Sequence, residues 1–157
     1  MSVETVREYL KTLSLDDRII PFKNTDVTVD STALALNIEA DRICKGLAFR
    51  GKGCDGIVVL ASGNARVDNH KFKEVMGYRP SMLPPEDVER VTGHPAGTVN
   101  PFCLNEGVKL YFDLSIRRHL GETVFPGGGD ENTVVELTIP ELEKAADPER
   151  WIDVCKL

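Results

Sequence analysis

Hydrophobic residues near the N-terminus recur at the spacing of a helix. Val3, Val6, Leu10 and Leu13 follow one another at steps of three or four positions, which places them on one face of a helix that buries its apolar side. The spacing therefore predicts an amphipathic helix over residues 2–13.

The rest of the chain alternates short apolar runs with polar segments that contain glycine and proline. Runs typical of strands occur at residues 19–22, 43–50, 57–60, 79–83, 108–114, 122–125 and 134–137. Helical spacing with capping residues predicts helices over residues 32–36, 69–76, 84–92 and 139–146. A glycine-rich turn at residues 51–56 joins two of these strands, so we expect a β-hairpin there.

Two further local signals complete this pattern. Residues 24–31 are rich in side chains that can cap a helix, so they are predicted to form the turn before the helix at 32–36, with Asn37 as its stop. Trp151 is the only tryptophan, and we expect it to pack the C-terminal tail onto the body of the protein.

The strand at residues 43–50 carries one lysine in an otherwise apolar run. Alternation sends Lys45, Leu47 and Phe49 to one face, and Cys44, Gly46, Ala48 and Arg50 to the other. Lys45 either stands at the mouth of a pocket, or lies along the core with its ammonium in water and no function. Both interpretations fit the spacing, and the rest of the chain must decide between them.

A second informative segment is the loop at residues 94–102, which two prolines and a glycine keep from forming a helix. Backbone amides that are not engaged in a strand ladder are good hydrogen-bond donors to a bound carbonyl or to a developing oxyanion. The alternative is a tight surface connection with no chemical role.

The length and composition are those of one ordinary globular domain. A chain of 157 residues with 41% hydrophobic and 28% charged residues can bury roughly two thirds of its unfolded surface in a single core. No apolar run approaches the roughly 18 residues that a membrane span requires, and the first residues lack a basic region followed by an apolar one. We therefore expect one domain over residues 1–157 and a cytoplasmic protein.

Cysteine and histidine spacing gives no indication of a metal site. The four cysteines contain no CxxC pair and the three histidines no HxxxH pair, so we expect neither a metal nor another cofactor. The glycines at residues 51–56 do not match a phosphate-binding loop, because no GxxxxGK motif is present and no helix follows. Cys44 adjoins Lys45, whose cation could favour a reactive thiolate, but alternation points the two side chains apart.

The charge pattern limits the kind of nucleic-acid contact that the chain can make. A formal net charge of −6 argues against a broad phosphate-binding surface and against DNA as a partner. Residues 42–79 nevertheless contain eight basic and three acidic residues. This local excess suits a limited contact, such as one end of a nucleic acid, although an ordinary solvated face has the same composition.

Three motifs follow one another along the chain: the strand lysine Lys45, a GxxxP motif at residues 97–101, and the glycine-rich turn at residues 127–129 before a strand. Together they resemble the YbaK/EbsC family, which includes the ProX-type free-standing trans-editing aminoacyl-tRNA deacylases. The resemblance extends from the N-terminal helix through Leu142. It implies an α+β fold, in which a curved, mixed, mostly antiparallel sheet is flanked by helices and a pocket lies between Lys45 and the GxxxP loop.

The resemblance also implies a reaction, which is hydrolysis of the ester between a wrong amino acid and the terminal adenosine of a tRNA. In that family the lysine holds the substrate at the pocket mouth, and the backbone of the loop glycine, here Gly97, contacts the reacting end. An ammonium offers three donors, and fixed amides suit the oxyanion of a tetrahedral intermediate. A positioned water can attack an activated ester, so a lysine nucleophile forming a Schiff base is the less favoured mechanism.

Several positions depart from the commoner family form, which leaves the amino acid that is removed open. Gly46 and Ala48 replace bulkier or hydroxyl residues, and Thr98 stands where a second glycine is common. Asp130 is a candidate for contacting the substrate amine and equally for a solvated turn residue. The other expected substrate-binding residues, for the pocket wall or the amine, are Phe22, Thr28, Val29, Thr98, Val99, Asn100, Pro101 and Asn132.

Three functions are compatible with these features. The leading hypothesis is a deacylase that removes a small amino acid such as alanine or cysteine from proline tRNA, which binds by its acceptor end. The alternatives are a non-catalytic module that binds or regulates aminoacyl-tRNA, and a hydrolase of small aminoacyl esters. A synthetase partner that supplies tRNA affinity is compatible with the acidic chain, as are a monomer and a homodimer.

Overall fold

A six-stranded sheet forms the centre of the computed structural model, which describes residues 3–23 and 28–157. Its strand order is β8-β6-β2-β3-β5-β9. The strands are β2 (Ile43–Phe49), β3 (Gly56–Ser62), β5 (Val108–Asp113), β6 (Thr123–Pro126), β8 (Leu137–Thr138) and β9 (Arg150–Ile152). Two small sheets pair β1 (Ile19–Pro21) with β7 (Thr133–Val135), and β4 (Arg66–Val67) with β10 (Cys155–Lys156).

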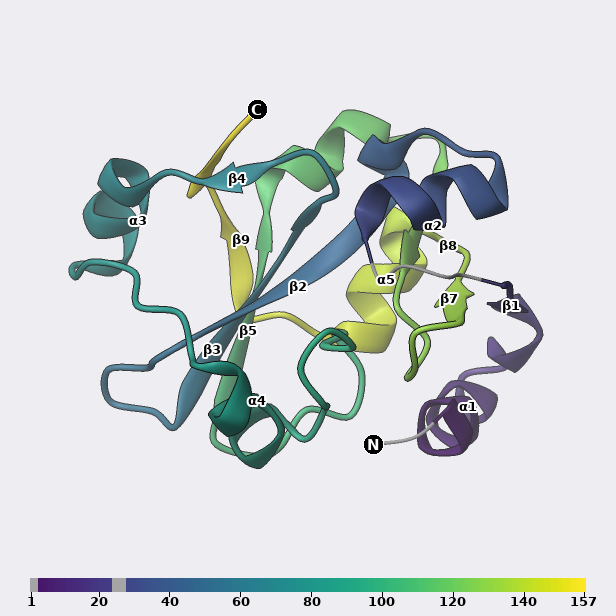
Figure 1. Ribbon diagram of the computed structural model, residues 1–157, viewed down its shortest axis with the longest axis horizontal. Helices are drawn as coiled ribbons and strands as arrows, with labels where there is room; N and C mark the ends of the chain where they lie inside the picture. Colours follow the sequence, from purple (N-terminus) through teal and green to yellow (C-terminus); the bar gives the residue numbers. More distant parts are fainter. Residues whose placement is uncertain (1–2, 24–27) are drawn as a thin grey trace.

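The sheet is curved and mixed, as expected (Figure 1). Strands β2 and β3 form the antiparallel hairpin that the glycine-rich turn predicts. Strand β2 pairs in parallel with β6, β3 with β5, and β5 with β9. The expectation of a mostly antiparallel sheet is wrong for the six-stranded sheet, in which three of the five pairings are parallel, because β2, β3 and β5 each pair with a strand that a long connection brings alongside.

Helices cover both faces of this sheet. The α-helices are α1 (Val3–Thr12), α2 (Val29–Leu36), α3 (Asn69–Met76), α4 (Pro85–Thr92) and α5 (Ile139–Ala146). Three short 3₁₀ helices are η1 (Asp16–Arg18), η2 (Ala40–Arg42) and η3 (Leu114–His119). No helix within the described residues is long and apolar enough to cross a membrane.

Strand alternation divides the core into two main clusters. Val58 and Leu60 of the fully buried β3 pack with residues of α1 and α5, whereas Ile57 and Val59 pack with Phe72 of α3. Successive side chains of a strand point to opposite faces, so one strand serves both clusters. On β2, Leu47 and Phe49 join the α3 cluster, so the face predicted for Lys45 is confirmed.

Most predicted elements are present, with three corrections. Helix α2 begins at Val29 instead of residue 32, because Thr28 and Ser31 form a capping box; residues 24–27 of the predicted turn lie outside the described residues. The strand predicted at 79–83 is reduced to a single bridge between Met82 and Phe49. The strand predicted at 134–137 is divided into β7 and β8, which pair with different partners.

The structure confirms the predicted helix ends, the predicted cap of α3 and the predicted packing of Trp151. Asn37, Gly77 and Gly93 end α2, α3 and α4 in left-handed backbone conformations. Asp68 caps α3 by accepting hydrogen bonds from the backbone amides of His70 and Lys71. Trp151 packs edge-on against Phe112, at 5.2 Å between ring centroids, and so fixes the C-terminal segment to the sheet.

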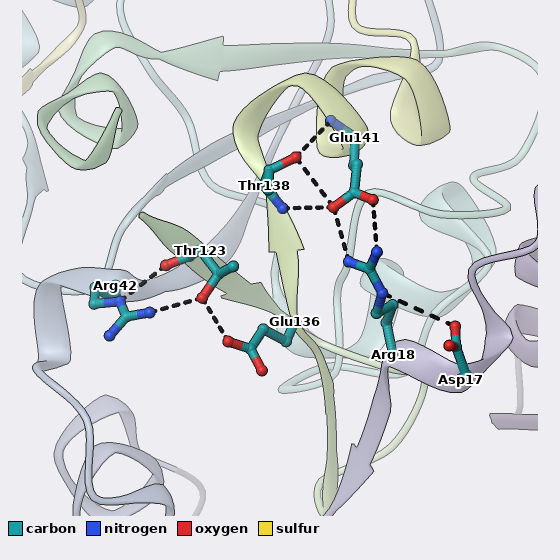
Figure 2. Close-up of polar contacts among 7 residues, drawn as sticks. All are labelled: Asp17, Arg18, Arg42, Thr123, Glu136, Thr138 and Glu141. Atoms are coloured by element: carbon teal, nitrogen blue, oxygen red, sulfur yellow. Dashed lines mark hydrogen bonds and ion pairs between the residues drawn. The ribbon is translucent and has the colours of Figure 1, made fainter. Parts of the chain in front are cut away.

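Two polar networks hold together the elements around the start of β2 and the start of α5 (Figure 2). The Arg42 guanidinium, just before β2, donates to the Thr123 carbonyl at 2.8 Å and to the Thr123 hydroxyl at 2.7 Å. These bonds secure the parallel contact in which Ile43 lies opposite Phe125. The hydrogen bonds between Arg42 and Thr123, which are 81 positions apart in the sequence, thus help to determine which residues of β6 lie beside β2.

The second network in Figure 2 joins η1 to the first turn of α5. Arg18 donates to both carboxylate oxygens of Glu141, at 2.8 and 2.9 Å. The same carboxylate accepts from the Thr138 amide at 2.9 Å, which completes the capping box of α5. The hydrogen bonds from Arg18 and from the Thr138 amide lower the pKa of Glu141 below its ordinary value.

Glu141→Ala should lower the free energy of unfolding at pH 7 by about 1–2 kcal/mol, because it removes a helix cap and a partly exposed ion pair. The lowered pKa means that this stabilisation exists above the ordinary carboxyl pKa of about 4.3 and is lost as the pH falls through the folded-state pKa. Denaturant unfolding at pH 7 and at pH 3 measures the effect. Glu143→Ala on the exposed side of α5 is the control, and an equal effect of Glu141→Ala at both pH values would contradict the assignment.

Candidate functional site

A cavity of about 200 Å³ lies where β2, the loop at residues 97–99, the start of α2 and the segment from β6 to β7 meet. Its walls are mostly apolar, and charged groups stand at its edge. Of the residues expected in the site, eight line this cavity: Phe22, Thr28, Val29, Lys45, Gly97, Thr98, Val99 and Asp130. Asn100, Pro101 and Asn132 do not line it.

Lys45 lines the cavity from the N-terminal part of β2. The side chain is half-buried, and its ammonium donates to the Gly63 carbonyl at 3.1 Å. Burial lowers the pKa of Lys45, and the nearby Arg66 cation lowers it further. An ammonium with three donors and one protein acceptor retains donors for a ligand.

The contact between β2 and the GxxxP loop depends on the absence of a side chain at Gly46. A Cβ atom at this position would lie 2.6 Å from the Val99 carbonyl oxygen and 2.9 Å from Val99 Cγ1. Such distances are too short for a carbon atom, so any larger residue would force the loop away from the strand. Gly46 therefore allows the loop to close the cavity over β2.

A buried histidine and asparagine hold the loop from behind. The His94 ring contacts the Phe102 carbonyl through Nε2 at 2.6 Å and the Asn100 amide nitrogen through Nδ1 at 3.3 Å. Asn100 Nδ2 donates to the Thr98 carbonyl, and Asn100 Oδ1 accepts from the Phe102 amide at 3.0 Å. Both side chains are fully buried, so Asn100 is a support of the loop and not part of the cavity wall.

These contacts agree with a neutral His94. Burial lowers the pKa of His94, with the hydrogen bond to Phe102 opposing the shift. In the neutral tautomer that fits the contacts, Nε2 carries the hydrogen and donates to the Phe102 carbonyl, while Nδ1 accepts from Asn100. The loop is thereby fixed by a fully paired polar network.

Not all loop amides are available to a ligand. The Thr98 amide donates to the Pro95 carbonyl at 3.0 Å, which forms a tight turn around Gly97 with its positive φ of 86°. Within the described residues, the amides of Gly97 and Val99 have no hydrogen-bond partner. Two donors on a fixed loop at the cavity wall form a suitable binding site for a carbonyl oxygen or an oxyanion.

Carboxylates stand at another edge of the cavity, on the turn before β7. Asp130 Oδ1 accepts from the Asn132 amide at 2.7 Å and from the Thr133 hydroxyl at 2.9 Å, which orients the carboxylate, and Glu131 lies beside it. Asn132 acts through its backbone, since its carbonyl accepts from the Phe22 amide at 2.8 Å. A ligand with an ammonium group would be attracted to this edge.

None of the described residues that line the cavity is a strong nucleophile at neutral pH. Cys44 borders it, but burial raises the pKa of its thiol to about 12, so the sulfur is not a thiolate at neutral pH. Among the described residues, no group of three or more His, Cys, Asp or Glu side chains could hold a metal ion. The arrangement suits the binding and activation of a carbonyl compound that water attacks.

Several lining residues were not predicted from the sequence: Thr32, Ile43, Phe125, Gly127, Glu131, Thr133 and Val134. Phe125 reaches the cavity because β6 pairs with the start of β2, and no local pattern reveals that pairing. Glu131 follows Asp130 in the glycine-rich turn before β7. Its position next to a predicted site residue was the one feature of the sequence that could have indicated it.

Comparison with known proteins gives a consistent family. The sequence model described as the aminoacyl-tRNA editing domain matches residues 24–145. The chain is 36% identical over 156 residues to the uncharacterized protein YwhH of Bacillus subtilis (strain 168), with 99% of this chain and 98% of that protein covered. It is 30% identical over 129 residues to a proline–tRNA ligase of Thermosipho melanesiensis. This match includes 81% of this chain but only 22% of the ligase.

Solved structures agree with these relatives. The crystal structure of a candidate trans-editing enzyme for prolyl tRNA synthetase matches with a TM-score of 0.85 and 25% identity, over 99% of this chain and 97% of that one. The hypothetical protein APE2540 matches with a TM-score of 0.82 and 28% identity, over 96% and 99% of the two chains. The fold is thus that of free-standing editing proteins over its whole length.

Asn100→Ala should destabilise the protein by about 1–3 kcal/mol, because it leaves the buried Phe102 amide and His94 Nδ1 without partners. It should also speed hydrogen exchange at the Phe102 amide, which NMR of the ¹⁵N-labelled protein measures. Asn132→Ala, an exposed asparagine, is the matched control and should change neither quantity. Unchanged exchange at Phe102 in the Asn100 variant would show that this network does not hold the loop.

Proposed function

Because this chain belongs to the aminoacyl-tRNA editing domain family, we propose that it hydrolyses the ester bond of a mischarged aminoacyl-tRNA. The observation that carries the proposal is the cavity itself, which has the Lys45 ammonium on one side and the unpaired amides of Gly97 and Val99 on another. The aminoacyl group enters this cavity, and the terminal adenosine remains at its mouth.

The proposed chemistry follows from the groups that surround the cavity. Water attacks the ester carbonyl carbon, and the carbonyl oxygen becomes an oxyanion that the Gly97 and Val99 amides stabilise. The bond between that carbon and the ribose oxygen then breaks. The ribose oxygen takes up the proton that the attacking water gives up, and the free amino acid and the uncharged tRNA leave.

Lys45 and Asp130 have complementary roles in binding. The Lys45 ammonium binds an oxygen of the terminal nucleotide, as a phosphate or ribose acceptor, and so holds the ester against the loop. The Asp130 carboxylate, with Glu131 beside it, attracts the α-ammonium group of the amino acid. The substrate carries a positive amine at one end and negative phosphates at the other, and the two edges of the cavity match this order.

The size of the cavity and the relatives favour a small amino acid on proline tRNA. A volume of about 200 Å³ accommodates a short side chain such as that of alanine or cysteine between Phe22, Val29 and Val99. Proline–tRNA ligases are among the relatives, and the chain spans about a fifth of the length of the one from Thermosipho melanesiensis. A synthetase that delivers the tRNA would be consistent with the net charge of −6.

Lys45→Ala should lower kcat/KM for the deacylation of the correct substrate by about 10- to 100-fold, since a charge-assisted hydrogen bond contributes about 1.5–3 kcal/mol and 1.4 kcal/mol corresponds to tenfold. The measurement is release of labelled amino acid from alanyl-, cysteinyl- and seryl-tRNA of the proline type. Lys52→Ala, an exposed lysine in the turn between β2 and β3, is the matched control.

The outcomes of this assay separate the candidate functions. Turnover by the wild type that falls by the predicted roughly 10- to 100-fold in the folded Lys45→Ala variant is the expected result. Full activity of that variant would refute the assigned role of Lys45. Binding of aminoacyl-tRNA without any turnover would identify a recognition module, and equal hydrolysis of a minimal aminoacyl ester and of aminoacyl-tRNA would identify a small-ester hydrolase.

A further inference from the structure

Two cations face each other on the short sheet formed by β4 and β10. Arg66 lies directly opposite Lys156 in this antiparallel pair, and both side chains are exposed. Like charges placed directly opposite each other on neighbouring strands are destabilising. Within the described residues, neither side chain forms an ion pair that would relieve the repulsion.

The orientation of both cations is determined by the neighbouring pair on the same strands. Cys155 lies opposite Val67, and these two side chains pack into the core cluster that contains Phe72. Alternation therefore directs Arg66 and Lys156 away from the core, on the outer side of the sheet. Figure 1 shows β4 crossing the C-terminal segment at the end of the molecule where α3 lies.

The sheet formed by β4 and β10 lies close to Lys45, which lines the cavity. The Lys45 ammonium donates to the carbonyl of Gly63, which belongs to the turn between β3 and β4, three residues before Arg66. The Arg66 cation is near enough to contribute to the lowered pKa of Lys45, after the larger effect of burial. Arg66 is thus close to Lys45, and Lys156 lies opposite Arg66 on β10; we call these three cations the Lys45 line.

The neighbouring acidic groups leave this line positively charged. Asp68 is near Lys156 and is ionised, because the α3 amides that it caps hold its pKa below the ordinary value, so it offsets one of the three positive charges. Asp153 is paired with Lys71 at 3.0 Å, and burial raises the pKa of Cys155 to about 12, so its sulfur carries no negative charge at neutral pH. The acidic residues that line the cavity, Asp130 and Glu131, lie on a different segment, the turn before β7.

We propose that Arg66 and Lys156 bind the sugar–phosphate backbone of the nucleotides that precede the terminal adenosine of the tRNA. Single-stranded nucleic acid carries one phosphate per nucleotide, so a strand that leaves the cavity at Lys45 meets these two cations next. The repulsion between them is relieved when phosphates bind. The inference rests on the proposed function, since it extends the path of the same substrate beyond the cavity.

The test compares the double variant Arg66→Ala/Lys156→Ala with the wild type on two substrates. For aminoacyl-tRNA, KM should rise about tenfold or more while kcat stays unchanged. For an aminoacyl-adenosine ester, which has no phosphates, neither value should change. The slope of log affinity against log salt concentration should become shallower by about 0.7 for each lost phosphate contact.

A matched control and a binding assay complete the test. Arg50→Ala/Lys52→Ala removes the same charge from exposed positions at the other end of β2 and should leave both substrates unaffected. Equal losses in the two double variants, or equal losses of the Arg66/Lys156 variant on both substrates, would overturn the inference. Binding of uncharged tRNA, measured by fluorescence anisotropy, tests these two side chains even if the wild type hydrolyses no substrate.

Discussion

The close contact between the Val99 carbonyl and the bare backbone of Gly46 is the constraint on which the site depends. A loop with two prolines gains no strand ladder of its own, so it needs a neighbour against which to rest. Strand β2 provides that neighbour only because no Cβ atom stands between them. The buried pair His94 and Asn100 then holds the loop from the other side, and the free amides of Gly97 and Val99 keep a fixed direction.

Charge is arranged around the cavity in a way that the net charge of the chain conceals. Although the formal charge is −6, cations lie from Lys45 outward along β4 and β10, and carboxylates lie on the turn before β7. A substrate with an amine at one end and phosphates along the other can be oriented by such a division even on an acidic protein. The apolar wall between the two edges leaves room for a short side chain.

Patterns between residues that are close in the sequence were sufficient to predict part of the site. Alternation placed Lys45 on the face of Leu47 and Phe49, and glycine and proline located the hairpin turn and the GxxxP loop, since these features depend on neighbours in sequence. Phe125, Thr133 and Val134 could not be found in this way, because they reach the cavity through strand pairings between distant segments. Asn100 was expected at the wall, and only its burial against His94 reveals that it supports the loop.

The most direct measurement of the central claim is an NMR titration of the ¹⁵N-labelled protein with a non-hydrolysable aminoacyl-adenosine analogue, in which an amide replaces the ester. If the cavity between β2 and the loop holds the aminoacyl end, the amide signals of Gly46, Gly97 and Val99 will shift in a saturable way, together with those of the turn at Asp130. Saturable shifts confined to another surface, or no shifts at concentrations that saturate deacylation of the corresponding tRNA, would contradict the account.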